Sequence, residues 1–135
     1  MPARRLTGHF GAQQRPAGLE EAASKGHRRA ALAVDVMVYE VKKYIGAFAA
    51  ALGGLNAVAF AGGIGENSWR VRQEVCRDME FLGICLDDAA NRQPSRADRI
   101  ISSPGSGVAV LVVNTNEEIV VARETVRVLA AAAGA

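Results

Sequence analysis

The chain contains 135 residues, of which half are hydrophobic and 22% are charged, and its formal net charge is +2. This length and composition predict one folded domain with a sizeable core, and they exclude an intrinsically disordered chain. No apolar run approaches the roughly 18 residues that cross a bilayer, and the N-terminus lacks the apolar segment of a signal peptide, so we expect a cytoplasmic protein without a membrane partner.

The first 18 residues contain glycines and prolines but no apolar period. Such a segment cannot bury enough apolar surface to offset its ordering entropy, so residues 1–18 are predicted to be disordered. Residues 1–30 hold six basic residues against two acidic ones, a surplus that nucleic acid could attract. These charges are not interleaved with aromatic residues and form no known reader motif, so we favour a solvated tail and expect no nucleic-acid partner.

A long amphipathic helix is predicted from Leu19 onwards, ended by Gly53 and Gly54. Apolar residues recur in it at steps of three and four residues; they are Val34, Met37, Val38, Val41, Ile45, Phe48 and Leu52. The stripe could pack on a partner helix, but we favour packing on the sheet of the same domain.

The chain is organised around residues 57–68, where an apolar run stops at glycines and an amphipathic segment opens at Asn67 or Ser68. We predict a strand at 57–61, a tight loop and a helix N-terminus. Backbone N–H groups exposed by glycines and by a helix start suit a phosphate, although a simple tight connection is an equally good interpretation. A Walker A loop is excluded because Glu66 and Asn67 stand where it needs Lys and Ser or Thr, and the dinucleotide fingerprint fits poorly.

The rest of the sheet is predicted from short apolar runs. Residues 57–61 and 108–113 are apolar on both faces, which is typical of central strands in a covered parallel sheet. The other predicted segments are short strands at 82–86 and 99–102, a polar loop at 87–98 and a turn at 103–107. Cys76 and Cys85 have no metal-type spacing, so we expect buried or reduced thiols.

A second junction follows the strand at 108–113, where a helix is predicted to run towards Ala131. Thr115 and Glu118 have the spacing of a capping box, which assigns Glu118 to its own helix start. Glu117 has no such duty, and open α/β sheets keep ligands and metals at the carboxyl ends of their strands. Two roles for Glu117 stay equally open: a metal ligand, or a favourable charge at a helix N-terminus.

Both junctions together resemble the C-terminal part of acetate kinases, at AGGIGENS (61–68) and NTNEE (114–118). Supporting matches stand in the same order at KYIGA (43–47), EFLGI (80–84) and VARET (121–125). That family folds as two actin-like, ribonuclease-H-like α/β domains around a cleft. The resemblance therefore implies that residues 19–135 are a partial C-terminal acetate kinase domain, the nucleotide-binding part of an ATPase domain of the acetate and sugar kinase superfamily.

The resemblance also implies a function, the reversible phosphorylation of acetate by ATP to give acetyl phosphate and ADP. It assigns magnesium to Glu117 and no catalytic residue to this chain. It assigns nucleotide binding to Gly63, Ile64, Gly65, Glu66 and Asn67. Acetate or acetyl phosphate would bind only with the missing N-terminal part, and a homodimer is expected as in the family. The alternative is a truncated, non-catalytic ATP-binding fragment or remnant.

Two features depart from the family. Asn114 stands where the family has proline, and residues 1–18 lack the Asp/Arg nucleotide-contact motif that should precede the long helix. We therefore expect residues 1–18 to be unlike the family and favour a displaced start or a frame change as their origin, the alternative being a divergent loop.

Overall fold

The computed structural model describes residues 16–115 and 117–133. The predicted disorder of residues 1–15 lies outside this range, but the prediction is wrong for residues 16–18, which open helix α1 (Pro16–Ser24). Proline is well placed at a helix start because the first turn leaves its backbone N–H groups unbonded. The helix-forming residues that follow, Leu19 to Ala23, extend that turn.

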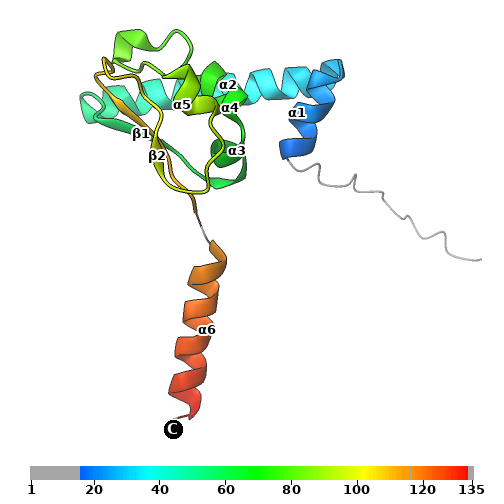
Figure 1. The fold of residues 1–135 in the computed structure, drawn as a ribbon, viewed down its shortest axis with the longest axis vertical. Coiled ribbons are helices and arrows are strands. Elements are labelled where there is room, and N and C mark those ends of the chain that lie inside the picture. Colours follow the sequence, from blue (N-terminus) through cyan, green and yellow to red (C-terminus); the bar gives the residue numbers. More distant parts are fainter. Residues whose placement is uncertain (1–15, 116, 134–135) are drawn as a thin grey trace, which may run out of the picture.

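The predicted long helix is two helices. Helix α2 (Arg28–Leu52) is separated from α1 by a turn at Gly26, whose φ of 85° favours glycine. His27 caps α2, its Nδ1 accepting a hydrogen bond from the backbone N–H of Ala30 at 3.2 Å. At the other end Gly53 adopts φ 74° and its N–H bonds the last carbonyls, as the sequence predicted. Figure 1 shows α1 folded back at the start of the long α2.

A three-stranded sheet lies beside α2, in the order β1-β3-β2. Strands β1 (Ala57–Phe60) and β3 (Ala109–Val112) run parallel, whereas β2 (Arg99–Ile100) is antiparallel to β3. Strand β3 is central, as predicted, but β1 is an edge strand on which Ala57 and Ala59 are exposed, so its prediction as a covered central strand is wrong. Alanine is small and apolar enough to stand on either side of a sheet, so the pattern there could not distinguish an open face from a covered one.

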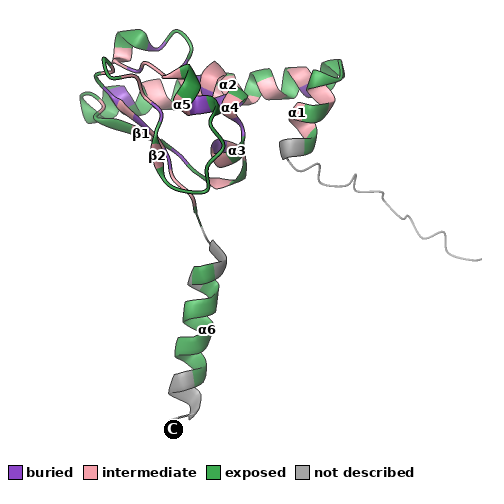
Figure 2. Ribbon diagram, in the orientation of Figure 1, coloured by how far each residue is buried: buried purple, intermediate pink, exposed green. Residues whose placement is uncertain are grey.

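The core lies between one face of this sheet and the helices α2 and α4 (Trp69–Cys76). Its buried residues come from β1, α4, β3 and the connections between them; they are Phe60, Val71, Val75, Cys76, Met79, Ile84, Ile101, Val108, Val110 and Val112. Burial is concentrated there in Figure 2. The apolar stripe of α2 packs partly buried on this cluster through Val34, Met37, Val38, Val41 and Ile45. This confirms the predicted packing on the same domain for that part of the stripe, whereas its last two members, Phe48 and Leu52, are exposed.

Three short helices occupy segments that the sequence predicted differently. The glycine segment is itself a helix, α3 (Gly62–Asn67). The predicted strand at 82–86 is preceded by a 3-10 turn, η1 (Glu80–Leu82), and retains only a single bridge from Leu86 to Ser102. The predicted loop at 87–98 contains α5 (Asp88–Arg92), which Asp87 caps by accepting hydrogen bonds from the N–H groups of Ala89 and Ala90.

Helix α6 (Glu117–Ala133) leaves the end of β3 and points away from the rest of the molecule (Figure 1). Its residues 121–129 are all exposed. Over the described ranges, no helix is both long and apolar enough to cross a membrane.

Candidate functional site

The parallel pairing of β1 and β3 brings the two predicted junctions side by side. Phe60 pairs with Val112 at the carboxyl end of both strands, and the backbone N–H of Val113 donates to the carbonyl oxygen of Phe60 at 2.9 Å. Helix α3 therefore begins next to the point where β3 gives way to Asn114 and Thr115. Ligands of open α/β sheets bind at such carboxyl ends.

Glu66 joins the two junctions directly. Its Oε1 accepts hydrogen bonds from the N–H of Gly62 at 2.9 Å, from the N–H of Thr115 at 2.9 Å and from the hydroxyl of Thr115 at 2.7 Å. The N–H of Thr115, then its hydroxyl, lower the pKa of the Glu66 carboxyl from its ordinary value, because they stabilise the charged form. The sequence analysis assigned Glu66 to nucleotide binding. In the structure, its Oε1 connects the start of α3 to Thr115. No local pattern indicates this, because the Thr115 contact spans 49 positions of the chain.

The glycines of α3 stand at their positions for different structural reasons. Gly62 adopts φ 70°, which favours glycine, whereas a Cβ at Gly63 would meet nothing within 4 Å. Gly65 is buried, and a Cβ there would lie 3.3 Å from the carbonyl carbon of Phe60. The predicted loop is therefore a tight helical turn packed on β1. A Cβ would meet open space at both Gly62 and Gly63, but only Gly63 is exposed and has a φ outside the left-handed region.

Asn67 and Ser68 end this turn and start the next helix. The Asn67 side chain is exposed and its Nδ2 donates to the carbonyl oxygen of Gly63 at 2.7 Å. Ser68 caps α4, as the predicted helix start requires, because its Oγ accepts from the N–H of Val71 at 3.1 Å. The Ser68 hydroxyl also donates to the Glu20 carboxylate, which ties α1 to the site.

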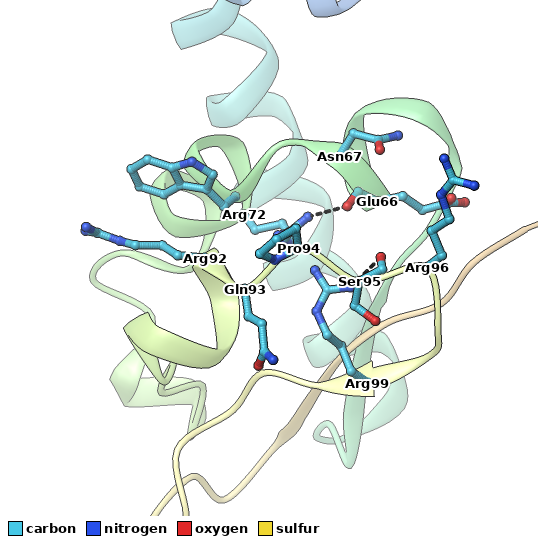
Figure 3. A pocket seen from close by; sticks show the side chains of 10 residues that line it. Glu66, Asn67, Arg72, Arg92, Gln93, Pro94, Ser95, Arg96 and Arg99 are labelled. Atoms are coloured by element: carbon cyan, nitrogen blue, oxygen red, sulfur yellow. Dashed lines mark hydrogen bonds between the residues drawn. The ribbon is translucent and has the colours of Figure 1, made fainter.

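Arg72 clamps the site from α4 and was not foreseen. Its side chain is 1% exposed. Nη1 donates to the carbonyl oxygens of Gly65 and Glu66 at 2.8 and 2.9 Å, while Nε and Nη2 donate to the Oδ1 and the carbonyl oxygen of Asn91, both at 2.8 Å. The backbone carbonyls among these acceptors belong to the last turns of α3 and α5. Carbonyl groups in the last turn of a helix have no hydrogen-bond donor within that helix. Figure 3 shows Arg72 reaching Glu66.

Glu117, the predicted magnesium residue, is the first residue of α6, and its side chain lies outside the described part of the structure. Among the described residues, no three His, Cys, Asp or Glu side chains form a group that could hold a metal. A Mg²⁺ ion carried by nucleotide phosphates needs only one or two protein carboxylates. Glu117 would supply one such carboxylate, and its backbone lies two residues after Thr115, beyond the carboxyl end of β3.

Comparison with known proteins identifies relatives of this chain. The Acetokinase family model matches residues 10–123. The acetate kinase of Heliobacterium modesticaldum is 49% identical over 111 residues, which are 82% of this chain and 28% of that relative. The acetate kinase of Oleidesulfovibrio alaskensis is 51% identical over 111 residues with the same shares. The crystal structure of Porphyromonas gingivalis acetate kinase is similar with a TM-score of 0.74 and 43% identity, over 85% of this chain and 29% of that one.

The family match begins at residue 10, before Leu19, where we placed the start of the resemblance. Asn91 and Arg72, which the sequence analysis did not single out, also lie inside the match. The chain spans a little more than a quarter of the length of the curated relatives it matches. Because the family model covers most of the chain, this protein belongs to the acetokinase family.

Proposed function

We propose that this chain is a C-terminal part of an acetate kinase and supplies the nucleotide and magnesium side of its site. The observation that supports this most is the Glu66 bridge, which joins the glycine-rich turn to Thr115, in the segment after β3, at the carboxyl ends of two parallel strands. In this proposal Gly63, Ile64, Gly65 and Asn67 contact the nucleotide and Glu66 shapes their turn. The complete enzyme would have two actin-like domains around a cleft, and this chain would be part of one of them.

Phosphoryl transfer requires little covalent chemistry from the protein, because positioning and neutralisation of phosphate oxygens supply most of the acceleration. Mg²⁺ bound near Glu117 would neutralise those oxygens. The open surface at Gly63 would let a nucleotide approach the backbone of α3 closely. No described residue is assigned to the acceptor carboxylate or to the transferred phosphoryl group.

The complete activity, phosphorylation of acetate by ATP to acetyl phosphate and ADP, requires the part of the family fold that this chain does not span. That part would bind acetate or acetyl phosphate. A homodimer and a cytoplasmic location follow from the same proposal. The second candidate is a non-catalytic ATP-binding fragment or remnant, and the observation that favours it is that no described residue is assigned to the acceptor carboxylate or to the transferred phosphoryl group.

Calorimetric titration of the full chain with ATP and Mg²⁺ tests the nucleotide site. We expect sub-millimolar affinity at best, because one wall of a cleft buries only part of a ligand. Gly63→Val should abolish binding, since its side chain would project into the open space beside α3. Gly105→Val is the matched control: it also has open space, and it lies in the turn before the amino end of β3. Equal binding by wild type and Gly63→Val would place the nucleotide elsewhere.

The magnesium assignment is tested in the same titration with and without Mg²⁺. Glu117→Gln should remove the gain in ATP affinity that Mg²⁺ provides, while Glu124→Gln, further along α6 and paired with Arg127, should retain it. An unchanged magnesium effect in Glu117→Gln would reject the assignment. Acyl phosphate formation by the purified chain alone is expected to be absent, and turnover that Glu117→Ala abolishes would instead show a complete kinase.

A further inference from the structure

A cleft of about 450 Å³ opens beside α3, bounded by α4, by α5 and by the segment from Gln93 to Arg99. Four arginines line it: Arg72, Arg92, Arg96 and Arg99. Among the described residues that line it, the only carboxylate is that of Glu66. Four guanidinium groups and one carboxylate give the lining of this cleft a larger positive surplus than the net charge of +2 carried by the whole chain, although the Arg92 guanidinium lies on the side away from Glu66 in Figure 3.

None of the four arginines forms an ion pair within the described residues. The ion pairs that those residues form join Lys25 to Glu21, Lys43 to Glu40, Arg77 to Glu74 and Arg127 to Glu124. Oε1 of Glu66 already accepts three hydrogen bonds. The nearby Asp98 carboxylate accepts from the N–H of Asn114 at 2.8 Å. Like charges that outnumber the carboxylates of a shared cleft repel each other.

Each arginine is held differently. Arg72 is buried and its donors serve protein carbonyls, so it adds charge to the cleft floor; burial first, and then the charge of Arg99, lower its pKa from the ordinary value. Arg92 stacks over the ring of Trp69, with Cζ 4.5 Å from the ring centroid. Arg96 is exposed and extends along the side of the cleft where Glu66 and Asn67 lie (Figure 3).

Arg99 is the residue that points most directly to a ligand. Its Nη1 donates to the carbonyl oxygen of Ser95 at a long 3.3 Å, and its Nε is buried without a hydrogen-bond partner. A buried donor that has left water without finding an acceptor is unfavourable. An acceptor inside the cleft would satisfy Nε and relieve the repulsion between Arg99 and Arg72.

We propose that this cleft binds a phosphate-bearing anion, whose oxygens accept hydrogen bonds from Arg99 and Arg96 while Arg92 and Arg72 supply charge. The forked guanidinium group matches phosphate oxygens in geometry, and a stacked arginine is already positioned for it. The site shares a wall with Glu66 and Asn67 but does not use the open face at Gly63, so it goes beyond the proposed nucleotide contact. The ligand's phosphate is free phosphate or pyrophosphate, not the phosphates of the nucleotide at α3.

The test titrates the full chain with inorganic pyrophosphate at 0.15 M NaCl, where nonspecific surface attraction is largely screened. Binding is followed by calorimetry and by the NMR signals of the Trp69 indole and the Arg99 Nε–H. We expect saturable binding that Arg96→Gln/Arg99→Gln weakens at least tenfold. Arg28→Gln/Arg123→Gln removes the same charge from exposed positions outside the cleft and should change affinity less than twofold.

Mg-ATP titrations separate the two sources of phosphate. The cleft variant should keep its ATP affinity within twofold, and Gly63→Val should keep its pyrophosphate affinity. If the cleft variant loses Mg-ATP binding as well, the phosphates of the nucleotide occupy the cleft and its independence is overturned. Unsaturable binding, or equal weakening by the control pair, would overturn the site itself. Arg96→Gln alone, at an exposed residue, repeats the test if the double variant is unstable, with an expected weakening of at least threefold.

Discussion

Replacement of Arg72 by methionine should destabilise the protein strongly, because methionine keeps the apolar stem and removes every donor. Of the four acceptors that Arg72 serves, the carbonyl oxygen of Gly65 and both oxygens of Asn91 are in buried contacts. An orphaned buried acceptor costs about 1–3 kcal/mol, so three of them give about 3–5 kcal/mol once water entry and relaxation reduce the upper limit. That loss is a large part of the total stability of a small domain.

Urea unfolding followed by circular dichroism measures this change, provided that the slope against urea concentration stays constant. Arg72→Lys should recover part of the loss, because an ammonium group reaches one helix end but lacks the planar fork that serves two. Arg70→Met is the matched control: Arg70 is exposed and its Cζ lies 5.3 Å from the ring centroid of Trp69, so we expect a change below about 1 kcal/mol. If Arg72→Met were no more destabilising than Arg70→Met, the clamp described above would be wrong.

Three further outcomes are expected. Hydrogen bonds lower the pKa of the Glu66 carboxyl in the folded state, so the ionised carboxylate stabilises the fold fully above the unfolded pKa of about 4.5, and this stabilisation is lost as the pH falls through the folded value. The difference in unfolding free energy between wild type and Glu66→Gln should therefore shrink from pH 7 to pH 3. A constant difference would contradict this. Burial raises the pKa of the Cys76 thiol to about 12, so a thiol reagent at pH 8 should modify Cys85 first, and faster labelling of Cys76 would refute its burial. Gly65→Ala should lower the urea midpoint while Gly63→Ala does not, because only the former crowds Phe60; equal midpoints would reject the packing role.

The two strand-to-helix junctions could be predicted from the sequence because their signals are local. An apolar run, a glycine or polar stop and a capping residue such as Ser68 all lie within a few positions of one another. The end of α2 at Gly53 has the same character. The side-by-side placement of the two junctions was not predicted, because the register that pairs Phe60 with Val112 joins residues far apart in the chain.

The parts that could not be predicted depend on contacts between distant residues. Helix α5 has five residues, too few to show an apolar period, and the bonds from Arg72 to Asn91 span 19 positions. The cleft arginines at 92, 96 and 99 resemble a solvated loop in the sequence, because only the fold brings them to Trp69 and Arg72. The break at Gly26 is different: glycine there was a visible signal, and the continuing helical composition obscured it.

The short helices around the site explain why charged side chains have such large structural roles here. Helices of five or six residues are not stable in water, because nucleating a turn costs more than its few hydrogen bonds return. Helix α3 obtains its missing partners from Glu66 at its start and from Arg72 at its end. Helix α5 obtains them from Asp87 and from the same Arg72. The Arg72 guanidinium group donates hydrogen bonds to carbonyl oxygens in the last turns of both helices. The positions of the glycine turn and of the arginine cleft are therefore coupled, because a shift of either one would break hydrogen bonds to Arg72.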